Sequence, residues 1–381
     1  MSVRSAGIAV GLTSASCLFF LFTLEIGLRL LNPQIMMPHP NGMWELSPTR
    51  GCRLTPAFDG YHWYGEFNVR ITTSEQGLRD RTFGPKEANI GRILALGDSF
   101  TFGFGVEGYE SYPKRLEALL NEKRKGYDVI NAGFPGYGTL QELRYLEEEG
   151  LAFSPDIVLI GFFGFNDYTD NLRPPDRYKL VHGFLYDRNG YEQAERARQV
   201  RSGRLPIPFK DWLWAHTHSY RFLADRYRRL HHRAAAAEVK SDAGSNENTA
   251  FQPQSPEGMP AVKQEVFDIT IGYLKALMDE VRAHDAVPVL VMIPGIKMIQ
   301  TPGELWPQTW FKLKEFSEQQ KVPAIDLGPV FREAHVAGRS DALWYPLNKH
   351  WKASGHRVAA EFIRTELLRQ GVLPLSGEER S

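Results

Sequence analysis

From residue 92 onward, short apolar runs alternate along the chain with segments of helical periodicity. The apolar runs have the length and composition of strands that are buried on both faces of a sheet, and they lie at residues 92–96, 127–131, 156–161, 287–293 and 322–326. Apolar residues at helical spacing recur at 112–123, 140–149, 267–284, 310–320 and about 355–370. This alternation predicts an α/β fold of three layers, α/β/α, with about five parallel strands covered by helices on both faces.

One stretch interrupts this alternation. Residues 172–262 contain no clear strand pattern, carry an aromatic and basic segment at 212–233, and end in a run dominated by Ala, Ser, Asn, Gln, Glu and Pro. We interpret 172–262 as an insertion into a domain that spans 91–381, and we expect disorder at about 234–260. Four histidines of the insertion have no carboxylate or cysteine at ligand spacing, so we predict neither a metal site nor a cofactor there. These histidines are His216, His218, His231 and His232.

The amino-terminal segment is long and apolar enough to cross a membrane. From Ser5 to Leu24 there are about twenty residues without a charge, which matches a hydrocarbon core of ~30 Å. Arg4 precedes this stretch, whereas Glu25 and Arg29 roughly cancel after it, and this bias favours a cytoplasmic amino terminus. We therefore expect residues 5–31 to be a single-pass anchor in the cell inner membrane, with an exported periplasmic or extracellular body. The competing interpretation is a cleaved signal peptide, although no small-x-small cleavage site is evident.

The charge balance and the cysteine spacing exclude some kinds of partner and metal site from what we expect for this chain. Lys and Arg together number 45, and so do Asp and Glu, so the composition gives no reason to expect a nucleic acid. The spacing of Cys17 and Cys52 fits neither a disulfide framework nor a zinc site.

Residues 32–90 are rich in Pro, Gly and aromatic side chains, and we interpret them as an extended lead-in. Within it we expect a short edge strand at 67–71 and a solvated side chain for Arg79.

Polar groups suited to acyl transfer follow several of the predicted strands. Ser99 comes directly after the first apolar run, which stops at Gly97, and ligands of open α/β sheets bind beyond the carboxyl ends of the strands. Taken alone, Gly97-Asp98-Ser99 is also typical of an ordinary turn before a helix cap. Three other loops offer the backbone N–H of Gly136, the amide of Asn166 and the imidazole of His350. A hydroxyl, a base and oxyanion donors are the groups that acyl transfer needs.

In order and spacing, these four loops resemble the blocks of the SGNH (GDSL-type) hydrolase superfamily. The resemblance covers about residues 91–170 and 263–370, and its blocks are Gly97-Asp98-Ser99-Phe100, the loop from Asn131 to Gly136, Gly164-x-Asn166-Asp167 and the His350 block. It implies a flavodoxin-like SGNH fold. It also implies that Ser99 is the nucleophile, that His350 is the base, and that Ser99, Gly136 and Asn166 form the oxyanion hole.

Members with one amino-terminal anchor and a His-Trp pair in the last block are similar to exported polysaccharide-modifying enzymes, including the alginate O-acetyltransferase-like group. The expected function is therefore an exported serine esterase that hydrolyses an O-acyl ester of a carbohydrate or another ester substrate. One alternative is O-acetyl transfer onto an exopolysaccharide. Another is a catalytically weak carbohydrate-binding or scaffold protein in which Trp63, Trp344 and Trp351 stack on sugar rings.

The sequence departs from the superfamily at the acid of the triad. In the superfamily an aspartate stands two or three positions before the histidine, whereas here those positions hold Asn348 and Leu347. An asparagine carbonyl can accept the imidazole N–H, but it does not offset the imidazolium charge. Either Asn348 orients His350, or Asp341 or another carboxylate supplies the acid, or much of the catalysis is lost. His356 competes as the base, but a structural role near a helix start is the expected one.

Overall fold

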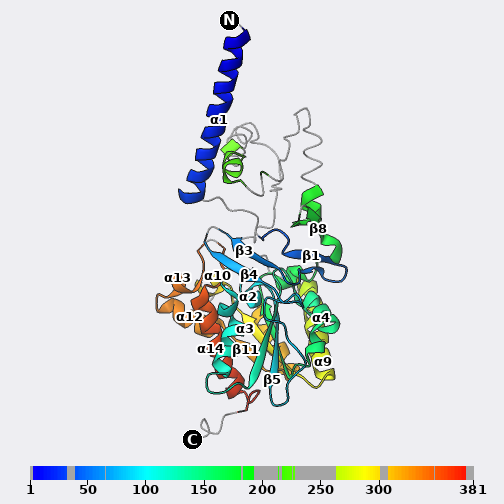
Figure 1. Cartoon of the computed structure of the whole chain (residues 1–381). Coiled ribbons are helices and arrows are strands. Elements are labelled where there is room, and N and C mark those ends of the chain that lie inside the picture. Colours follow the sequence, from blue (N-terminus) through cyan, green and yellow to red (C-terminus); the bar gives the residue numbers. More distant parts are fainter. Residues whose placement is uncertain are drawn as a thin grey trace. The chain divides into compact units, whose positions relative to one another are not determined.

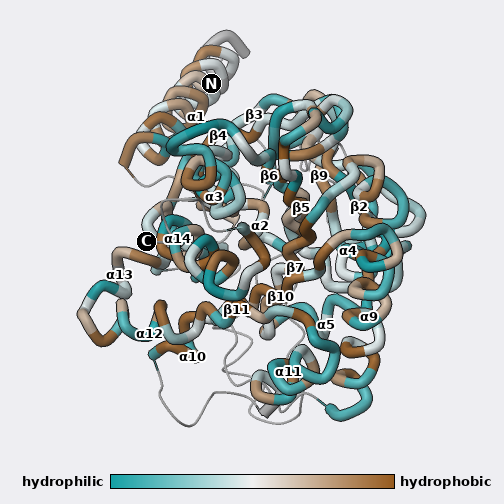
Figure 2. The backbone as a smooth tube through the Cα atoms, turned by 90° about the horizontal axis from the view of Figure 1, so that it is seen from below, coloured by the Kyte–Doolittle hydropathy of each residue, from teal (hydrophilic) through white to brown (hydrophobic). Residues whose placement is uncertain are grey.

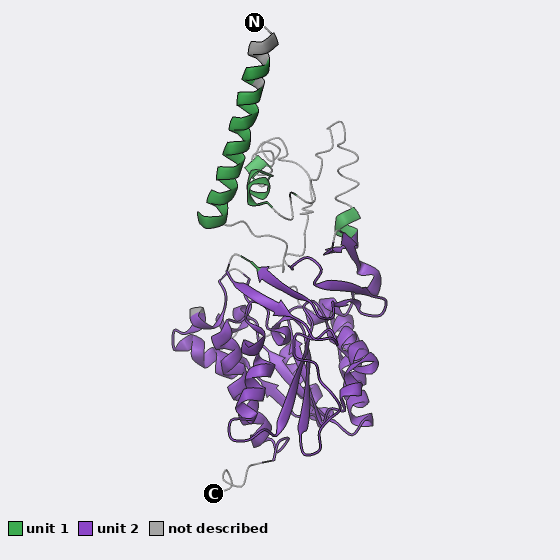
Figure 3. Ribbon diagram, in the orientation of Figure 1, with its two compact units in different colours: residues 1–38, 63–65, 189–251 green, residues 39–62, 66–188, 252–381 purple. Residues whose placement is uncertain are grey.

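The computed structural model describes residues 3–31, 39–64, 66–181, 183–192, 213, 217–224, 226–227, 263–300, 308–346 and 348–374. The chain divides into two compact units (Figure 3). The first comprises Met1–Pro38, Trp63–Gly65 and Asn189–Phe251, and the second comprises His39–His62, Glu66–Arg188 and Gln252–Ser381. All five predicted catalytic and oxyanion-hole residues, Ser99, Gly136, Asn166, Asn348 and His350, lie in the second unit.

A five-stranded parallel sheet forms the centre of the second unit (Figure 1). Its strands are β5 (Gly91–Gly97), β6 (Tyr127–Gly133), β7 (Ile157–Phe163), β10 (Val287–Ile293) and β11 (Ala324–Asp326), in the order β11-β10-β7-β5-β6. In the register of the sheet, Gly97 pairs with both Gly133 and Gly161. The loops after β5, β6 and β7 therefore start at the same edge of the sheet, side by side.

Helices cover both faces of this sheet, as Figure 2 shows. On one face lie α3 (Tyr112–Leu120), α12 (Gly328–Val336) and α14 (Ala353–Arg369), and on the other lie α4 (Thr139–Glu148), α9 (Gln264–Ala283) and α11 (Gln308–Gln319). Successive residues of β5 are fully buried because Ile93 and Ala95 face one layer while Leu94 and Leu96 face the other. The three-layer α/β/α prediction is confirmed, and the predicted strands and helices agree with the observed ones to within a few residues.

Short elements complete the second unit. They are α2 (Ser99–Phe102), η1 (Gly108–Glu110), η2 (Gly150–Phe153), α5 (Asp167–Asp170), η3 (Pro175–Arg177), α10 (Ile296–Gln300) and α13 (Ser340–Leu343). The expectation of no strand in residues 172–262 is wrong, because β8 (Tyr178–Val181) and β9 (Phe184–Asp187) form an antiparallel pair. Four-residue strands are too short to give a clear alternation. The stretch at 234–260, for which disorder was expected, lies outside the described residues.

The lead-in carries more structure than the single expected strand. It forms two two-stranded sheets, one from β1 (Trp44–Ser47) and β2 (Gly51–Leu54) and one from β3 (Asp59–Trp63) and β4 (Asn68–Thr72). The expected edge strand at 67–71 corresponds to β4. Arg79, expected in solvent, is instead buried, and its guanidinium donates to the carbonyl oxygens of Gly103 and Val106, each at 2.6 Å. The lead-in therefore supports the segment that follows α2.

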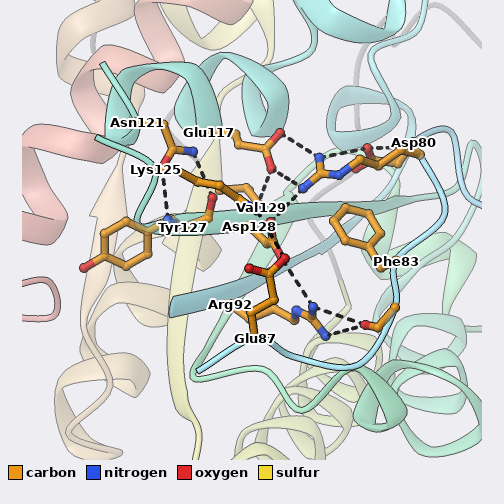
Figure 4. Close-up of polar contacts among 12 residues, drawn as sticks. Asp80, Phe83, Glu87, Arg92, Glu117, Asn121, Lys125, Tyr127, Asp128 and Val129 are labelled. Carbon is orange, nitrogen blue, oxygen red and sulfur yellow. Dashed lines mark hydrogen bonds and ion pairs between the residues drawn. The ribbon is translucent and has the colours of Figure 1, made fainter. Parts of the chain in front are cut away.

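Side chains cover the outer edge of β6, the last strand in the sheet order (Figure 4). The carboxylate of Glu117 accepts the main-chain N–H of Val129 at 3.1 Å, and that of Asp80 accepts the N–H of Asn131 at 3.0 Å. Lys114 donates to the carbonyl oxygen of Val129 at 2.8 Å. These contacts occupy main-chain groups that would otherwise be open to pairing with another strand.

The described part of the first unit is mainly one long helix, α1 (Val3–Leu31). Within it, Gly7–Leu31 is long and apolar enough to cross a membrane, and a signal sequence would have the same character. The carboxylate of Glu25 accepts the main-chain N–H groups of His218 at 3.1 Å and of Ser219 at 2.8 Å, and the Ser219 hydroxyl at 2.7 Å. Glu25, the only acidic residue of α1, is thus hydrogen-bonded to residues of its own unit. His216, His231 and His232, which the sequence analysis also considered, lie outside the described residues.

Candidate active site

Ser99 is the first residue of α2, immediately beyond the carboxyl end of β5. The connection turns at Gly97, where φ is +154° and a Cβ would lie 2.0 Å from Oγ1 of Thr101, so the turn requires glycine. Asp98 caps the helix, because its carboxylate accepts the N–H of Phe100 at 2.8 Å. These constraints place Ser99 at the edge of the sheet where the other loops begin.

Ser99 and His350 are in hydrogen-bond contact. The distance between Oγ of Ser99 and Nε2 of His350 is 2.8 Å, although the two residues are 251 positions apart in the sequence. On the other side of the ring, Nδ1 lies 3.2 Å from the main-chain carbonyl oxygen of Asn348. Because a carbonyl oxygen only accepts, Nδ1 carries the proton and Nε2 is left to accept one from the serine. The ring is therefore held in the tautomer that a general base requires.

Two aromatic rings enclose the imidazole of His350. The ring centroids of Phe104 and Phe100 lie 4.5 Å and 5.0 Å from it, at interplanar angles of 33° and 31°. Burial disfavours the charged imidazolium and lowers the pKa of His350 to about 4, although the hydrogen bond with the Asn348 carbonyl opposes this shift. His350 is consequently neutral at pH 7 and able to accept a proton.

The glycine-rich loop after β6 packs directly against the turn that carries Ser99. A Cβ on Gly133 would lie 2.2 Å from the main-chain nitrogen of Phe102, so α2 approaches the strand too closely for any side chain there. The N–H of Phe134 donates to the carbonyl oxygen of Gly97 at 2.9 Å. Gly136 follows with φ at +84°, a left-handed conformation that glycine adopts without cost. The loop that carries Gly136 is thus fixed to the Ser99 turn.

Asn166 reaches the same turn from the loop after β7. Its amide nitrogen donates to the carboxylate of Asp98 at 3.3 Å. An amide nitrogen carries two hydrogens, and the carboxylate of Asp170 is a second hydrogen-bond partner of this side chain. Burial raises the pKa of Asp98 to about 7, against the opposing effect of the hydrogen bonds from Phe100 and Asn166. Asp98 therefore links the turn that carries Ser99 to Asn166.

Nearby polar side chains fix the loops around Ser99 by hydrogen bonds to the main chain. Asp167 accepts the N–H of Phe163 at 2.8 Å, and Asn131 accepts the N–H of Gly133 at 3.0 Å. His356 is buried, and its Nδ1 accepts the N–H of Tyr112 at 3.2 Å. That bond occupies His356 in helix packing, whereas His350 is the histidine in contact with Ser99.

Asn348 lies beside His350 as predicted, but it orients the ring by a different atom. Its side-chain oxygen accepts the main-chain N–H of His350 at 2.9 Å, so the ring contact comes from the main-chain carbonyl and not from the side-chain amide. The side chain of Asp341, the alternative acid, lies outside the described residues, as does Leu347. Residue type does not encode the direction of a main-chain carbonyl, which is why the sequence did not indicate this arrangement.

The tryptophans considered for sugar stacking are mostly unavailable for it. Trp344 and Trp351 are 1% and 0% exposed, and the Trp351 ring stacks on Phe331 with centroids 4.7 Å apart. The prediction that these two side chains stack on sugars is therefore wrong. Trp63 belongs to the first unit, where its ring lies 5.2 Å from that of His218. Phe104 was not identified from the sequence, although its position in the aromatic run after Ser99 is a usable signal.

Comparison with known proteins gives a family match. A model of the GDSL-like Lipase/Acylhydrolase family matches residues 95–358. No match was found among curated proteins. Similar solved structures include a member of the lipolytic protein G-D-S-L family from Veillonella parvula (12% identity, 73% of this chain and 98% of that chain, TM-score 0.40). Another is the psychrotrophic esterase EstA from Pseudoalteromonas (14% identity, 74% of this chain and 100% of that chain, TM-score 0.39). A third is a mutant of the acetyl-xylooligosaccharide esterase Axe2 from Geobacillus (18% identity, 74% of this chain and 96% of that chain, TM-score 0.40). The family match spans the loops that carry Ser99, Gly136, Asn166 and His350.

Proposed function

The chain belongs to the GDSL-like lipase/acylhydrolase family, and from this premise we propose that it is a serine ester hydrolase with Ser99 as nucleophile and His350 as general base. The observation that carries the proposal is the 2.8 Å contact between Oγ of Ser99 and Nε2 of His350, in the tautomer that accepts a proton. The pKa of about 4 keeps His350 in its basic form near neutral pH.

The proposed reaction has two halves. Ser99 Oγ attacks the acyl carbon while its proton passes to Nε2 of His350, and the resulting oxyanion accepts hydrogen bonds from the N–H groups of Ser99 and Gly136 and from the Asn166 amide. Collapse of this intermediate releases the alcohol, which takes the proton from His350, and leaves an acyl-serine. Water then attacks the acyl-serine with His350 again as base, which releases the carboxylic acid and restores Ser99.

The proposed substrate is an O-acyl ester of a carbohydrate, and the proposed location is the outer side of a membrane. The likeness of the anchored sequence pattern to exported polysaccharide-modifying enzymes supports the first point. The apolar helix at Gly7–Leu31 supports the second. Transfer of the acyl group to a sugar acceptor instead of water uses the same acyl-serine, and it is an outcome that the assay below distinguishes.

The nucleophile is tested with a fluorophosphonate and peptide mapping of the labelled full-length chain. We expect the label on Ser99, and we expect Ser99→Ala to lose hydrolysis of p-nitrophenyl acetate by about 10³-fold or more while keeping its melting temperature. Labelling of another residue, or full activity of Ser99→Ala, would overturn the assignment.

The substrate class is tested by acetate release from acetylated xylo-oligosaccharides, with p-nitrophenyl acetate as the reference ester. A parallel reaction supplies p-nitrophenyl acetate together with unacetylated oligosaccharide. Acetylated sugar detected by mass spectrometry in that reaction would identify transfer. A higher kcat/KM for simple aryl esters than for every acetylated sugar would contradict the carbohydrate proposal.

Location is tested by protease accessibility of the second unit in intact and opened cells. Cleavage only in opened cells would contradict export to the cell surface. Cleavage only after disruption of the inner membrane would contradict export altogether.

A further inference from the structure

The imidazole of His350 takes its direction from a main-chain carbonyl, so its place depends on what holds the main chain at Asn348. The turn that joins these residues puts Lys349 at a φ of +63°. A residue with a Cβ adopts this left-handed conformation only where surrounding contacts favour it. Tyr345 supplies two of them, since its carbonyl oxygen accepts the N–H of Lys349 at 3.2 Å and its N–H donates to the carbonyl of His350 at 2.9 Å. Both bonds lie within the turn, so contacts with other segments of the chain must fix the position of the turn.

One such contact comes from the lead-in. The Oε2 atom of Glu66 accepts the main-chain N–H of Asn348 at 2.8 Å, across a sequence separation of 282 residues. Glu66 lies in the connection between β3 and β4, and Asn348 is buried. A hydrogen bond to an ionised acceptor is stronger than one between neutral groups, and more so where water is excluded. Glu66 therefore fixes the residue whose carbonyl oxygen meets His350.

Packing of the neighbouring residue fixes the segment that carries Glu66. The neighbouring Phe67 is buried, with its ring 5.4 Å from that of Tyr345 and 5.5 Å from that of Phe104. The hydroxyl of Tyr345 donates to the carbonyl oxygen of Gly105 at 2.8 Å. The β3–β4 connection, the His350 turn and the segment after α2 are thus packed together, so the position of Glu66 is coupled to both sides of the Ser99–His350 pair.

We propose that Glu66 is a positioning residue for the base: by accepting the N–H of Asn348, it holds the main-chain carbonyl that orients His350 towards Ser99. This inference rests on the proposed serine-hydrolase function. In a triad, a single aspartate both orients the histidine and faces its charge. Here the orienting part is shared between two groups, because the Asn348 carbonyl orients the ring and a carboxylate from a distant segment holds the main chain at Asn348.

The test compares variants of Glu66 in the full-length protein with p-nitrophenyl acetate as substrate. Glu66→Ala removes a charged hydrogen bond, so we expect kcat to fall by about tenfold or more with KM nearly unchanged. Glu66→Gln keeps an oxygen that accepts the N–H of Asn348, and we expect it to recover most of kcat. The Asn348 carbonyl raises the pKa of His350 against the effect of burial, so Glu66→Ala should also move the acid limb of kcat/KM to lower pH.

The matched control is Glu45→Ala. Glu45 is another lead-in glutamate, on β1, and its exposed carboxylate pairs with Arg53 at 2.7 Å. Exposed pairs of this kind contribute little, so we expect unchanged kcat and an unchanged pH profile. A general loss of stability in Glu66→Ala would lower the amount of active enzyme without moving the acid limb. Fluorophosphonate titration of active sites gives that amount directly.

Hydrogen exchange of the peptide that contains Asn348 provides a readout that does not need activity. We expect faster exchange in Glu66→Ala than in the wild type and in Glu45→Ala. Wild-type exchange together with wild-type kcat in Glu66→Ala would overturn the proposal, and so would equal losses in Glu66→Ala and Glu66→Gln with an unmoved acid limb. Retained hydrolysis in Ser99→Ala would instead overturn the serine-hydrolase function, and the exchange measurement would still report on the Glu66 contact.

Discussion

The main-chain carbonyl oxygen of Asn348 lies 3.2 Å from Nδ1 of His350, while the side-chain oxygen of Asn348 accepts the main-chain N–H of His350 at 2.9 Å. One residue thus both shapes the turn and orients the ring. In a serine protease, Asp→Asn lowers turnover by roughly 10⁴, largely because the histidine takes the wrong tautomer. A main-chain carbonyl never donates, so that particular loss does not apply to this site.

Substitution of Asn348 separates its side chain from its carbonyl. Asn348→Ala removes a neutral acceptor from the turn and leaves the carbonyl in place, so we expect kcat on p-nitrophenyl acetate to fall by about two- to tenfold. Asn348→Asp keeps an oxygen for the N–H of His350, and its kcat should stay close to that of the wild type. A large gain in kcat for Asn348→Asp would show that the new carboxylate reaches the imidazole, which contradicts the observed geometry.

The pH dependence of activity follows from the burial of His350. In the proposed mechanism the neutral imidazole of His350 is the active form. Its pKa is lowered from 6.5 to about 4, so we expect the base to remain functional as pH falls and to be lost only near pH 4. We expect the acid limb of kcat/KM near pH 4, measured with p-nitrophenyl acetate alongside circular dichroism to confirm folding. An acid limb at pH 6 to 7 that persists in Asp98→Asn would contradict this expectation.

Asp98 adds a second titration near neutrality, because burial raises its pKa to about 7. Asp98→Asn removes that titration and keeps an oxygen to accept the N–H of Phe100. Any inflection of the wild-type profile near pH 7 should therefore disappear in Asp98→Asn, while the limb near pH 4 persists. Disappearance of the lower limb in this variant would assign it to Asp98 and not to His350.

Asn166 is expected to act only once negative charge develops on the substrate. Loss of one oxyanion donor costs about 10²–10³ in kcat in a well-studied serine protease, with little effect on binding. We expect a fall of that order in Asn166→Ala with a nearly unchanged KM, measured by steady-state kinetics. Fluorophosphonate labelling of Ser99 in the same variant checks that the nucleophile turn remains formed. A fall in kcat of less than about tenfold would remove Asn166 from the oxyanion hole.

The sequence predicted the central sheet well because its strands are buried on both faces and read as continuous apolar runs, as at β10 (Val287–Ile293). It predicted Ser99 and His350 as site residues because short motifs of characteristic residue types follow the strands of this sheet. It missed the role of Arg79, since an isolated arginine has no pattern that distinguishes burial against carbonyl groups from solvation. It likewise missed the contact of Glu66 with Asn348, because a hydrogen bond to main chain across 282 residues leaves no trace in residue type or spacing.

Two glycines offer a matched pair that tests the close packing under the nucleophile. A Cβ on Gly133 would lie 2.2 Å from the nitrogen of Phe102 and 2.5 Å from the carbonyl carbon of Thr101, both of them main-chain atoms of α2. Because main-chain atoms yield little, Gly133→Ala must displace the helix that begins at Ser99. We expect a loss of about 1–3 kcal/mol in the free energy of unfolding. A shift of about 1 Å in a reacting group can cost 10²-fold, so kcat should fall by about that much.

Gly272 lies in α9, is exposed, and has open space where its Cβ would be. Gly272→Ala therefore removes backbone freedom from the unfolded chain without a clash, and we expect it to stabilise the protein by about 0.5–1 kcal/mol with unchanged kcat. Urea unfolding and steady-state kinetics on the two variants give both quantities. Because the two substitutions are chemically identical, opposite effects on stability isolate the contact with α2. Equal stability and full activity in Gly133→Ala would mean that α2 and the glycine-rich loop do not pack as closely as the structure places them.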